Sequence, residues 1–353
     1  MTDTKSEIRF GLGAIKGVGQ AAIEDIIKDR EENGNYTSML DFLQRMNLRT
    51  CTKRVLEPLA LAGAFDAIGD VHRAQFFVET DGTIFLEKLL RYASNYQTTK
   101  DSKQTSMFGE EMTEAQDFGL AFPSCTPWTS LQKLNKEREV TGFFISGHPL
   151  DDYRLEINSF CKYGLGDLEE SGMLKKLLNS TFNLAGMLAN ASTGIGKNGQ
   201  SYARIVLEDF QSKREFMLFG ENYMKFRHFC ESDSLLMLTV KSELSYGRDG
   251  RSEDDYRLTI MNIQLLENVM VEKTKRVTIK LSNGHLDDDL ILNIEKLIAD
   301  HRSPKGVVVR FNVFDLEQTM NVFLTSPEKV DAVPFCKSLR KLLHDDELIG
   351  LEG

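Results

Sequence analysis

The stretch GLGAIKGVGQAAIEDIIKDR, residues 11–30, contains residue types suited to binding an anion. Its four glycines precede apolar residues that recur at helical spacing. A glycine-rich turn leading into a helix presents free backbone N–H groups and the positive end of the helix dipole, and both attract anions. The anion could be a nucleotide cofactor or a nucleic-acid backbone, or the turn could bind nothing.

The spacing of the glycines argues against two kinds of cofactor site. GLGAIK places Lys16 where a dinucleotide fingerprint needs its last glycine, and no βαβ pattern follows. GIGKNG, residues 194–199, has Asn198 where a phosphate-binding loop needs Ser or Thr. Two interpretations remain: a glycine turn between helices without a ligand, and a helix-hairpin-helix module.

A helix-hairpin-helix module needs small residues in the hairpin, so that its backbone can touch a phosphate. It also needs an apolar residue between them to anchor the turn, and a small residue at Ala21 or Ala22 where two helices cross. Such a module contacts the DNA backbone and reads no bases. Residues 47–65 form a degenerate second copy. The predicted DNA-binding residues of the two copies are Lys16, Gly17, Val18, Gly19, Arg49, Lys53 and Arg54.

The rest of the chain changes from helical to strand periodicity after Ser180. Before it, the pattern predicts helices over 23–30, 38–46, 52–61, 131–140 and, singly or in a pair, within 71–96. After it, five strand-like runs with a helix at 221–229 between the third and fourth follow the order of an OB-fold barrel. The last 80 or so residues alternate strand, helix, two strands and helix, which predicts a small α+β domain, with the acidic residues 287–289 at a helix N-terminus.

These patterns predict a multi-domain α+β protein. Its parts are tandem helix-hairpin-helix and following helices (1–96), a polar linker (97–125), a helical connector (126–180), an OB-fold (181–270) and an α+β C-terminal domain (271–353).

The OB-fold has candidate residues for stacking bases and pairing phosphates of a single strand. They are Tyr202, Arg204 and Phe219 on strands, Lys197 and Arg214 in adjoining turns, and Tyr246, Arg248 and Arg251 in a later loop. The alternative is that the aromatic residues belong to the core and that the barrel is a spacer.

Charge and cysteine usage limit the classes of function. The net charge is −10, so any DNA contact must depend on a few placed cations and should be weak and salt-dependent. The five cysteines are scattered and never form a CxxC pair, which predicts neither disulfides nor a zinc site. With no signal peptide or membrane span, we expect a cytoplasmic protein. His148 precedes a proline in a helix-ending turn and is expected to be structural.

Three phrases resemble one family: IRFGLGAIKGVG, VLEPLALAGAFD and KEREVTGFFISGHPLDDY are similar to the C-terminal half of the alpha subunit of bacterial DNA polymerase III. The resemblance implies binding to double-stranded DNA, single-stranded template, the sliding clamp and the tau subunit of the clamp loader. The linker peptide QTSMF looks like the clamp-binding motif of this family, which makes Gln104, Thr105, Ser106, Met107 and Phe108 the candidate clamp contacts.

The family's palm domain, with its catalytic aspartates, and its amino-terminal phosphoesterase-like domain have no counterpart in this sequence. We therefore expect no catalytic residue, metal site or cofactor in this chain, with Mg²⁺ confined to the missing catalytic domain. The rival interpretations are a nuclease or nucleotidyltransferase with its own metal site, and an interaction scaffold whose DNA-binding elements are vestigial.

Overall fold

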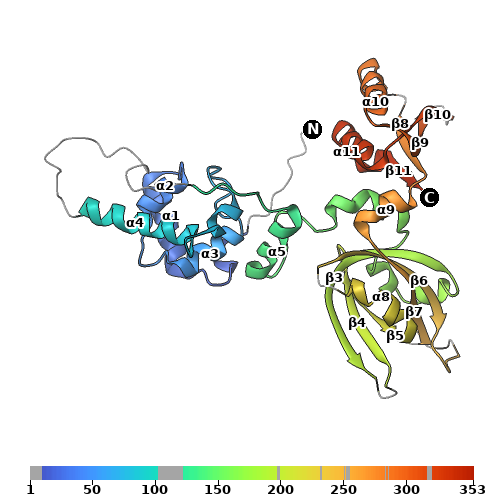
Figure 1. Cartoon of the computed structure of the whole chain (residues 1–353), viewed down its shortest axis with the longest axis horizontal. Helices are drawn as coiled ribbons and strands as arrows, with labels where there is room; N and C mark the ends of the chain where they lie inside the picture. The colour runs from blue at the N-terminus through green and yellow to red at the C-terminus, as the bar shows by residue number, and fades with distance from the viewer. Residues whose placement is uncertain are drawn as a thin grey trace. The chain divides into compact units, whose positions relative to one another are not determined.

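The structure is a computed structural model that describes residues 10–101, 122–196, 199–230, 233–249, 251, 255–282, 284, 286–315 and 320–353. It divides into two compact units, Met1–His148 and Pro149–Gly353, each considered by itself (Figure 1). The segment 126–180, predicted as a connector, contributes to both units. Within the described residues, no helix is long and apolar enough to cross a membrane.

The first unit is helical (Figure 1). Its elements are η1 (Leu12–Ala14), α1 (Gln20–Asn33), α2 (Met39–Arg45), α3 (Lys53–Leu61), η2 (Arg73–Phe77), β1 (Glu79–Thr80), β2 (Thr83–Ile84), α4 (Phe85–Asp101) and α5 (Ser130–Thr141). Helix α1 ends at Gly34, whose φ of +81° suits a glycine. Ser38 caps α2 by accepting a hydrogen bond from the N–H of Asp41. These caps set the tight turns that the sequence predicted between the first three helices.

One apolar core joins the helices of this unit. It includes Ile23 and Ile26 of α1, Phe42 of α2, Leu56 of α3 and Leu89 of α4, all buried. Within 71–96, where we predicted one or two helices, the structure has the 3-10 turn η2 and the short hairpin β1–β2 before α4 begins. The apolar residues of 71–96 still pack into this core, although they are not spaced as in one continuous helix.

The second unit contains a five-stranded antiparallel barrel sheet. Its strands are β3 (Thr181–Ile195), β4 (Ser201–Glu208), β5 (Lys213–Phe219), β6 (Leu235–Leu244) and β7 (Tyr256–Leu265). They pair in the order β5-β4-β3-β6-β7, and β5 and β7 approach each other at the edges. Helix α8 (Gly220–Phe226) lies between the third and fourth strands of the barrel. This is the strand and helix order of an OB-fold, as predicted.

The remainder of the second unit is mixed helix and sheet. It contains η4 (Asp151–Tyr153), α6 (Arg154–Phe160), η5 (Gly166–Glu169), α7 (Met173–Lys176), η6 (Arg227–Phe229), α9 (Leu266–Lys273), β8 (Arg276–Ser282), α10 (Asp288–Asp300), β9 (Arg302–Asp315), β10 (Met320–Val330), α11 (Ala332–Leu343), η9 (Asp346–Leu348) and β11 (Ile349–Glu352). The sheet order is β10-β9-β8-β11, with β8 and β9 parallel. Asp287 caps α10 through the N–H of Leu290, as its position at a helix start predicted. The fold class is therefore a multi-domain combination of α and β parts, as predicted.

Candidate nucleic-acid interface

The hairpin before α1 has the backbone geometry that the glycine spacing predicted. Gly17 has a φ of +85°, a conformation that favours glycine. Gly19 is the N-cap residue of α1, and a Cβ atom built on it would have no neighbour within 4 Å. Between them, the Val18 side chain is only 9% exposed and packs in the core of the unit. The turn is thus anchored by Val18 and open at Gly19.

Two helix N-termini supply unpaired backbone donors at this hairpin. Among the described residues, no backbone or side-chain acceptor is recorded for the N–H groups of Gly19, Gln20 and Ala21 at the start of α1. The same holds for the first two N–H groups of α3, those of Lys53 and Arg54. Neither helix has an acidic residue in its first turn. The positive ends of both helix dipoles therefore remain available to an anion.

The hairpin lies against the start of α3. A Cβ atom built on Gly17 would stand 3.5 Å from the carbonyl oxygen of Arg54 and 3.5 Å from Cγ of Pro58. The two predicted copies of the motif therefore meet at Gly17, where the glycine brings backbone close to backbone. In the second copy, Cys51 is fully buried and takes the anchoring place that Val18 has in the first.

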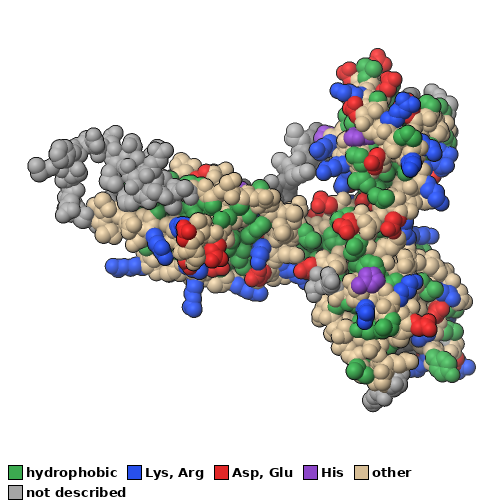
Figure 2. Space-filling view, in the orientation of Figure 1, with side chains coloured by type: hydrophobic (Ala, Val, Ile, Leu, Met, Phe, Trp, Pro, Cys, Tyr) green, Lys and Arg blue, Asp and Glu red, His purple; other side chains and the backbone are tan. Residues whose placement is uncertain are grey.

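Three of the four predicted cations at this surface have no counterion. Lys16, Arg49 and Arg54 are exposed, and none of them forms an ion pair with a described residue. Lys53, by contrast, lies 2.7 Å from the Glu87 carboxylate, and its hydrogen bond to that group raises the lysine pKa. Figure 2 shows Lys and Arg side chains projecting along one edge of the helical unit. Lys53 is thus the least available of the four for a phosphate.

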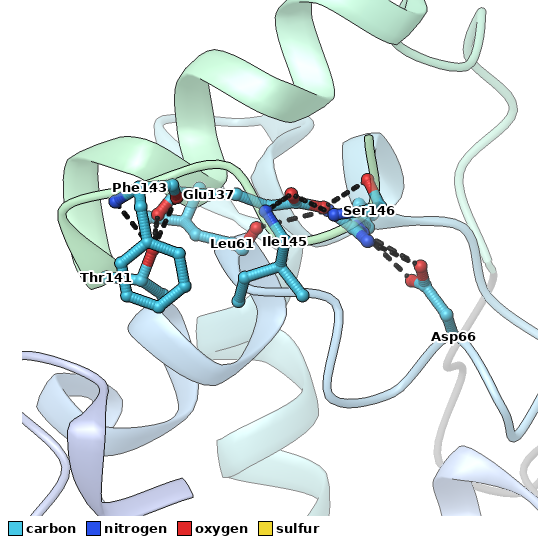
Figure 3. Close-up of polar contacts among 8 residues, drawn as sticks. Leu61, Asp66, Glu137, Thr141, Phe143, Ile145 and Ser146 are labelled. Carbon is cyan, nitrogen blue, oxygen red and sulfur yellow. Dashed lines mark hydrogen bonds and ion pairs between the residues drawn. The ribbon is translucent and has the colours of Figure 1, made fainter. Parts of the chain in front are cut away.

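An ion-pair network joins α5 and the loop after it to the earlier helices of the unit (Figure 3). The Arg73 guanidinium lies 2.7 Å from Glu137 of α5 and 2.7 Å from Asp66. The Glu137 carboxylate is fully buried and also accepts hydrogen bonds from the backbone N–H groups of Ile145 and Ser146, at 3.0 and 2.9 Å. It accepts a third from the Ser146 hydroxyl at 2.7 Å. The network fixes the loop after α5, the FFISGHPL segment, to the helices of the unit.

Helix α5 also touches the hairpin directly, because the N–H of Lys16 donates to the carbonyl oxygen of Val140 at 2.8 Å. Burial alone would raise the pKa of Glu137. Hydrogen bonds from Ser146 and Arg73 outweigh burial and lower that pKa below its usual value. Glu137 is therefore a charged carboxylate that orders its surroundings. The His148 ring packs edge-on against the Phe144 ring, and the ring centroids lie 5.5 Å apart. His148 thus takes part in the packing of the loop after α5.

The barrel brings three of its predicted residues to one sheet face. Tyr202 of β4 pairs across the strands with Phe219 of β5, and their ring centroids lie 6.0 Å apart. Tyr202 also pairs with Gly194 of β3, where an added Cβ atom would stand 2.8 Å from the phenol ring. Phe219 is 58% exposed. We name the surface formed by Gly194, Tyr202, Arg204 and Phe219 the aromatic platform.

Arg204 lies two residues along β4 from Tyr202 and therefore on the same face. Its guanidinium is 3.3 Å from the Glu215 carboxylate of β5, and both side chains are about half-exposed. Arg214 belongs to the opposite face, because it pairs with the buried Leu207. Its guanidinium donates to the carbonyl oxygen of Leu168 at 3.5 Å, and burial lowers its pKa. The structure thus separates Arg214 from the platform.

The later loop residues have mixed surroundings. Tyr246 is 98% exposed. Arg248 lies 3.6 Å from Asp255, and Arg251 lies 2.8 Å from Asp249. Lys197 and the predicted clamp motif, residues 104–108, lie outside the described residues.

Sequence reasoning missed Gly194 as part of the barrel surface. The available signal was a glycine inside a strand, which often marks close approach of another group. It also missed Met217 of β5, which pairs with Arg204 and so shares the platform's face. Strand alternation counted from Phe219 would have found Met217 and would have excluded Arg214, whereas Gly194 is placed by the pairing of β3 with β4.

Comparison with known proteins agrees with these parts. Residues 1–76 match a family model described as a helix-hairpin-helix motif. The chain is 28% identical over 301 residues to "DNA polymerase III subunit alpha" of Escherichia coli O157:H7, covering 84% of this chain and 24% of that protein. For the Borreliella burgdorferi protein of the same name, identity is 28% over 347 residues, covering 94% of this chain and 28% of the relative.

The chain thus spans about a quarter of the length of these curated relatives. Their similarity confirms the resemblance that the sequence phrases indicated. Among solved structures, the second OB-fold domain of replication protein A from Methanococcus maripaludis is 12% identical and covers 27% of this chain and 92% of that chain, with a TM-score of 0.19. That score is too low to support an argument, so the OB-fold assignment rests on strand order.

Proposed function

We propose that this chain is a non-catalytic, DNA-binding portion of a bacterial replicative DNA polymerase, working in the cytoplasm. The observation that carries the proposal is the packing of Gly17 against Arg54 and Pro58 of α3, which joins two helices that both begin without a side-chain cap. The exposed Lys16, Arg49 and Arg54 of these two segments form no ion pair with a described residue. Backbone amides and cations placed together suit the phosphates of a DNA backbone. The similarity to the polymerase alpha subunits supports replication as the process.

The hairpin supplies sequence-independent binding of duplex DNA. Its donors are backbone N–H groups, which contact phosphate oxygens and carry no information about bases. Three available cations would displace only a few counterions from the DNA. The logarithm of the binding constant should therefore fall linearly with the logarithm of salt concentration, with a slope of about −3. Such a grip allows a polymerase to stay on any sequence.

The aromatic platform supplies a candidate site for the single-stranded template. Phe219 offers an exposed ring beside Tyr202, and Arg204 lies next to them for a phosphate. Stacking on rings tolerates every base, because each base has a π-face. The Glu215 partner of Arg204 weakens this cation, so stacking is the larger contribution.

A binding titration tests the proposal. We would measure fluorescence anisotropy of labelled duplex and oligo-dT with the full chain at low and moderate salt. A variant with Lys16, Arg49 and Arg54 changed to Gln should lose most duplex affinity. The matched control changes Lys28, Arg30 and Arg91 to Gln, three exposed cations of the same unit. Equal loss in both variants, or no binding by the parent, would favour a scaffold with vestigial DNA-binding elements.

Incubation with primed DNA and Mg²⁺ tests the non-catalytic part of the proposal. We expect neither extension nor degradation of the primer, because the palm aspartates of the family have no counterpart here. Metal-dependent products that survive repurification of the chain would support the rival nuclease or nucleotidyltransferase.

We further propose that residues 104–108 bind the sliding clamp and that the C-terminal domain docks on the tau subunit of the clamp loader. QTSMF supports the first assignment, since Met107 and Phe108 can bury apolar groups in a groove. Changing both to Ala should abolish binding to an immobilised clamp in surface plasmon resonance and leave the melting temperature unchanged. The control changes Met112 and Phe118 to Ala in the same stretch of sequence. Clamp binding by the first variant would place the contact elsewhere.

A further inference from the structure

An open pocket of about 1000 Å³ lies in the second unit between α6, α9 and α11. None of the candidate DNA-binding residues lines it. Its wall includes apolar groups, namely the Tyr153 ring, Met270, Val333 and Cys336. We name it the α6–α11 pocket.

A buried carboxylate with one unpaired oxygen lines this pocket. Glu156 of α6 is 6% exposed, and its Oε2 atom has no hydrogen-bond partner among the described residues. A buried, unpaired carboxylate oxygen is costly, and proteins usually satisfy such groups. Asp152, Glu267 and Asp346 line the same pocket and add negative charge.

Arg340, whose charge lowers the pKa of Glu156, is already engaged. The Arg340 guanidinium donates to both carboxylate oxygens of Asp346, each at 2.7 Å, and to the carbonyl oxygen of Asp152 at 3.2 Å. This two-point pairing is the strongest arrangement that an arginine makes with a carboxylate. Arg340 thus pairs with one carboxylate, that of Asp346, and among the described residues no ion pair to Glu156 is formed.

The electrostatic surroundings are consistent with a deficit of positive charge. Burial raises the pKa of Glu156, and the nearby Asp346 and Asp152 raise it further, while Arg340 opposes them. Burial likewise raises the pKa of Tyr153, with contributions from Glu267, Glu156 and Asp152. An added cation would favour the charged form of Glu156, whereas Tyr153 stays a neutral phenol.

We propose that the α6–α11 pocket binds the side chain of a single Arg or Lys from a partner polypeptide, with the cationic head at Glu156. Such side chains lay an aliphatic stem along apolar surface and keep a charged tip. Tyr153, Met270 and Val333 provide the apolar wall, and Glu156 provides the charge. Exposed Lys337 and Lys341 also line the pocket and would repel a polybasic segment. The inference does not depend on DNA binding.

The probe is Nα-acetyl-arginine amide at millimolar concentrations, followed by saturation-transfer NMR with the full chain. Its neutral isostere, Nα-acetyl-citrulline amide, is the matched ligand. We expect saturable binding of the arginine compound alone, weakened at least fivefold by Glu156→Gln. Glu295→Gln, an exposed carboxylate of α10, should bind like the parent.

Val333→Trp narrows the pocket without altering the carboxylate and should also weaken binding at least fivefold. This variant keeps the test decisive if Glu156→Gln melts early. Equal binding of the citrulline compound, or unchanged binding in a folded Glu156→Gln variant, would overturn the proposal. If spermidine binds more tightly than the arginine compound, a free polyamine is the better occupant of the pocket. That result would overturn the proposal that the occupant is a side chain of a partner polypeptide.

Discussion

The helical hairpin and the aromatic platform offer nucleic acid two different chemistries. The hairpin presents backbone N–H groups of Gly19 and of the α3 start, and the platform presents the rings of Tyr202 and Phe219. Backbone donors suit phosphates, whereas rings suit unpaired bases. In the function that we propose, the hairpin therefore binds duplex and the platform binds single strands.

The two surfaces also differ in what holds them in place. In the helical unit, the buried Arg73–Glu137 pair ties α5 to the earlier helices. Beneath the platform, the barrel interior is apolar, with Ile205, Leu207 and Phe216 buried. Loss of one partner of a buried ion pair leaves the other charge uncompensated and strongly lowers the free energy of unfolding. In an apolar core, the loss of that free energy grows with the volume of side chain removed.

The largest expected effect is on the charged support. Arg73→Ala leaves Glu137 buried without its guanidinium and should cost the first unit roughly 3–5 kcal/mol of unfolding free energy. Hydrogen exchange followed by mass spectrometry should show lost protection in peptides of 10–101 and unchanged protection in the barrel. Arg276→Ala, which removes a partly exposed pair with Glu352, is the control and should cost below about 1 kcal/mol. Similar losses in both variants would contradict the distinction.

The platform should respond to loss of one ring. Phe219→Ala removes an exposed ring and should weaken oligo-dT binding by roughly 1–3 kcal/mol, the range for one stacked base. Duplex binding and thermal stability should stay near the parent's values. Ile195→Ala, an exposed apolar residue at the end of β3, is the control for anisotropy titrations. If both variants bind oligo-dT as the parent does, the barrel is a spacer.

A carboxylate at the helix N-terminus should separate binding from stability at the hairpin. Gly19→Asp gives α1 a favoured N-cap residue, so thermal stability should hold or rise by a few tenths of a kcal/mol. The same charge should repel phosphate and weaken duplex binding about fivefold, equivalent to about 1 kcal/mol. Thr129→Asp adds the same charge at the N-cap of α5 and should leave duplex binding unchanged. Undiminished binding by Gly19→Asp would remove the hairpin from the interface.

We expect a glycine to be needed at position 17 for its backbone conformation rather than for lack of room for a side chain. A Cβ atom there would make only ordinary contacts at 3.5 Å, but a φ of +85° disfavours any other residue. Gly17→Ala should therefore destabilise the first unit by about 1 kcal/mol in thermal melts. Gly13→Ala, where an added Cβ meets Ile23 at 3.5 Å without a positive φ, should change stability less.

Acid titration should affect two buried glutamates in opposite directions. The folded-state pKa of Glu137 is lowered, so its contribution to stability is present above pH 4.5 and is lost as pH falls through the lowered value. The folded-state pKa of Glu156 is raised, so its contribution is full below pH 4.5 and is lost as pH rises through the raised value. At neutral pH, Glu137→Gln should destabilise the chain in denaturant unfolding, and Glu156→Gln should not. Matching pH profiles for the two variants would refute these directions.

The sequence predicted local features better than those that depend on strand pairing. Gly34 and Ser38 end and begin helices through their own backbone and side chain, so both were readable from the chain. The strand β11 was missed because four residues, Ile349–Glu352, carry too little pattern and gain their place by pairing with β8. Arg214 was predicted in a turn beside the strands, whereas it lies in β5, and the register assigns it to the other face from Tyr202.

Residues 16–19 of the first hairpin lie together because they are neighbours along the chain, whereas their contact with Arg54 and Pro58 of α3 depends on packing. Their support was not predictable: no pattern in the sequence pairs Arg73 with Glu137, 64 residues away. The binding roles of the candidate residues remain predictions. The titrations above decide them.

The hydrogen bond from Lys16 to Val140 has a consequence for biosynthesis. A chain made from its N-terminus exposes the hairpin long before α5 exists, so the early helices lack both this acceptor and the carboxylate of Glu137. The hydrogen bond can form only after translation has passed residue 140. A truncated product that ends before α5 would carry the glycine motif without this acceptor and without the Glu137 carboxylate.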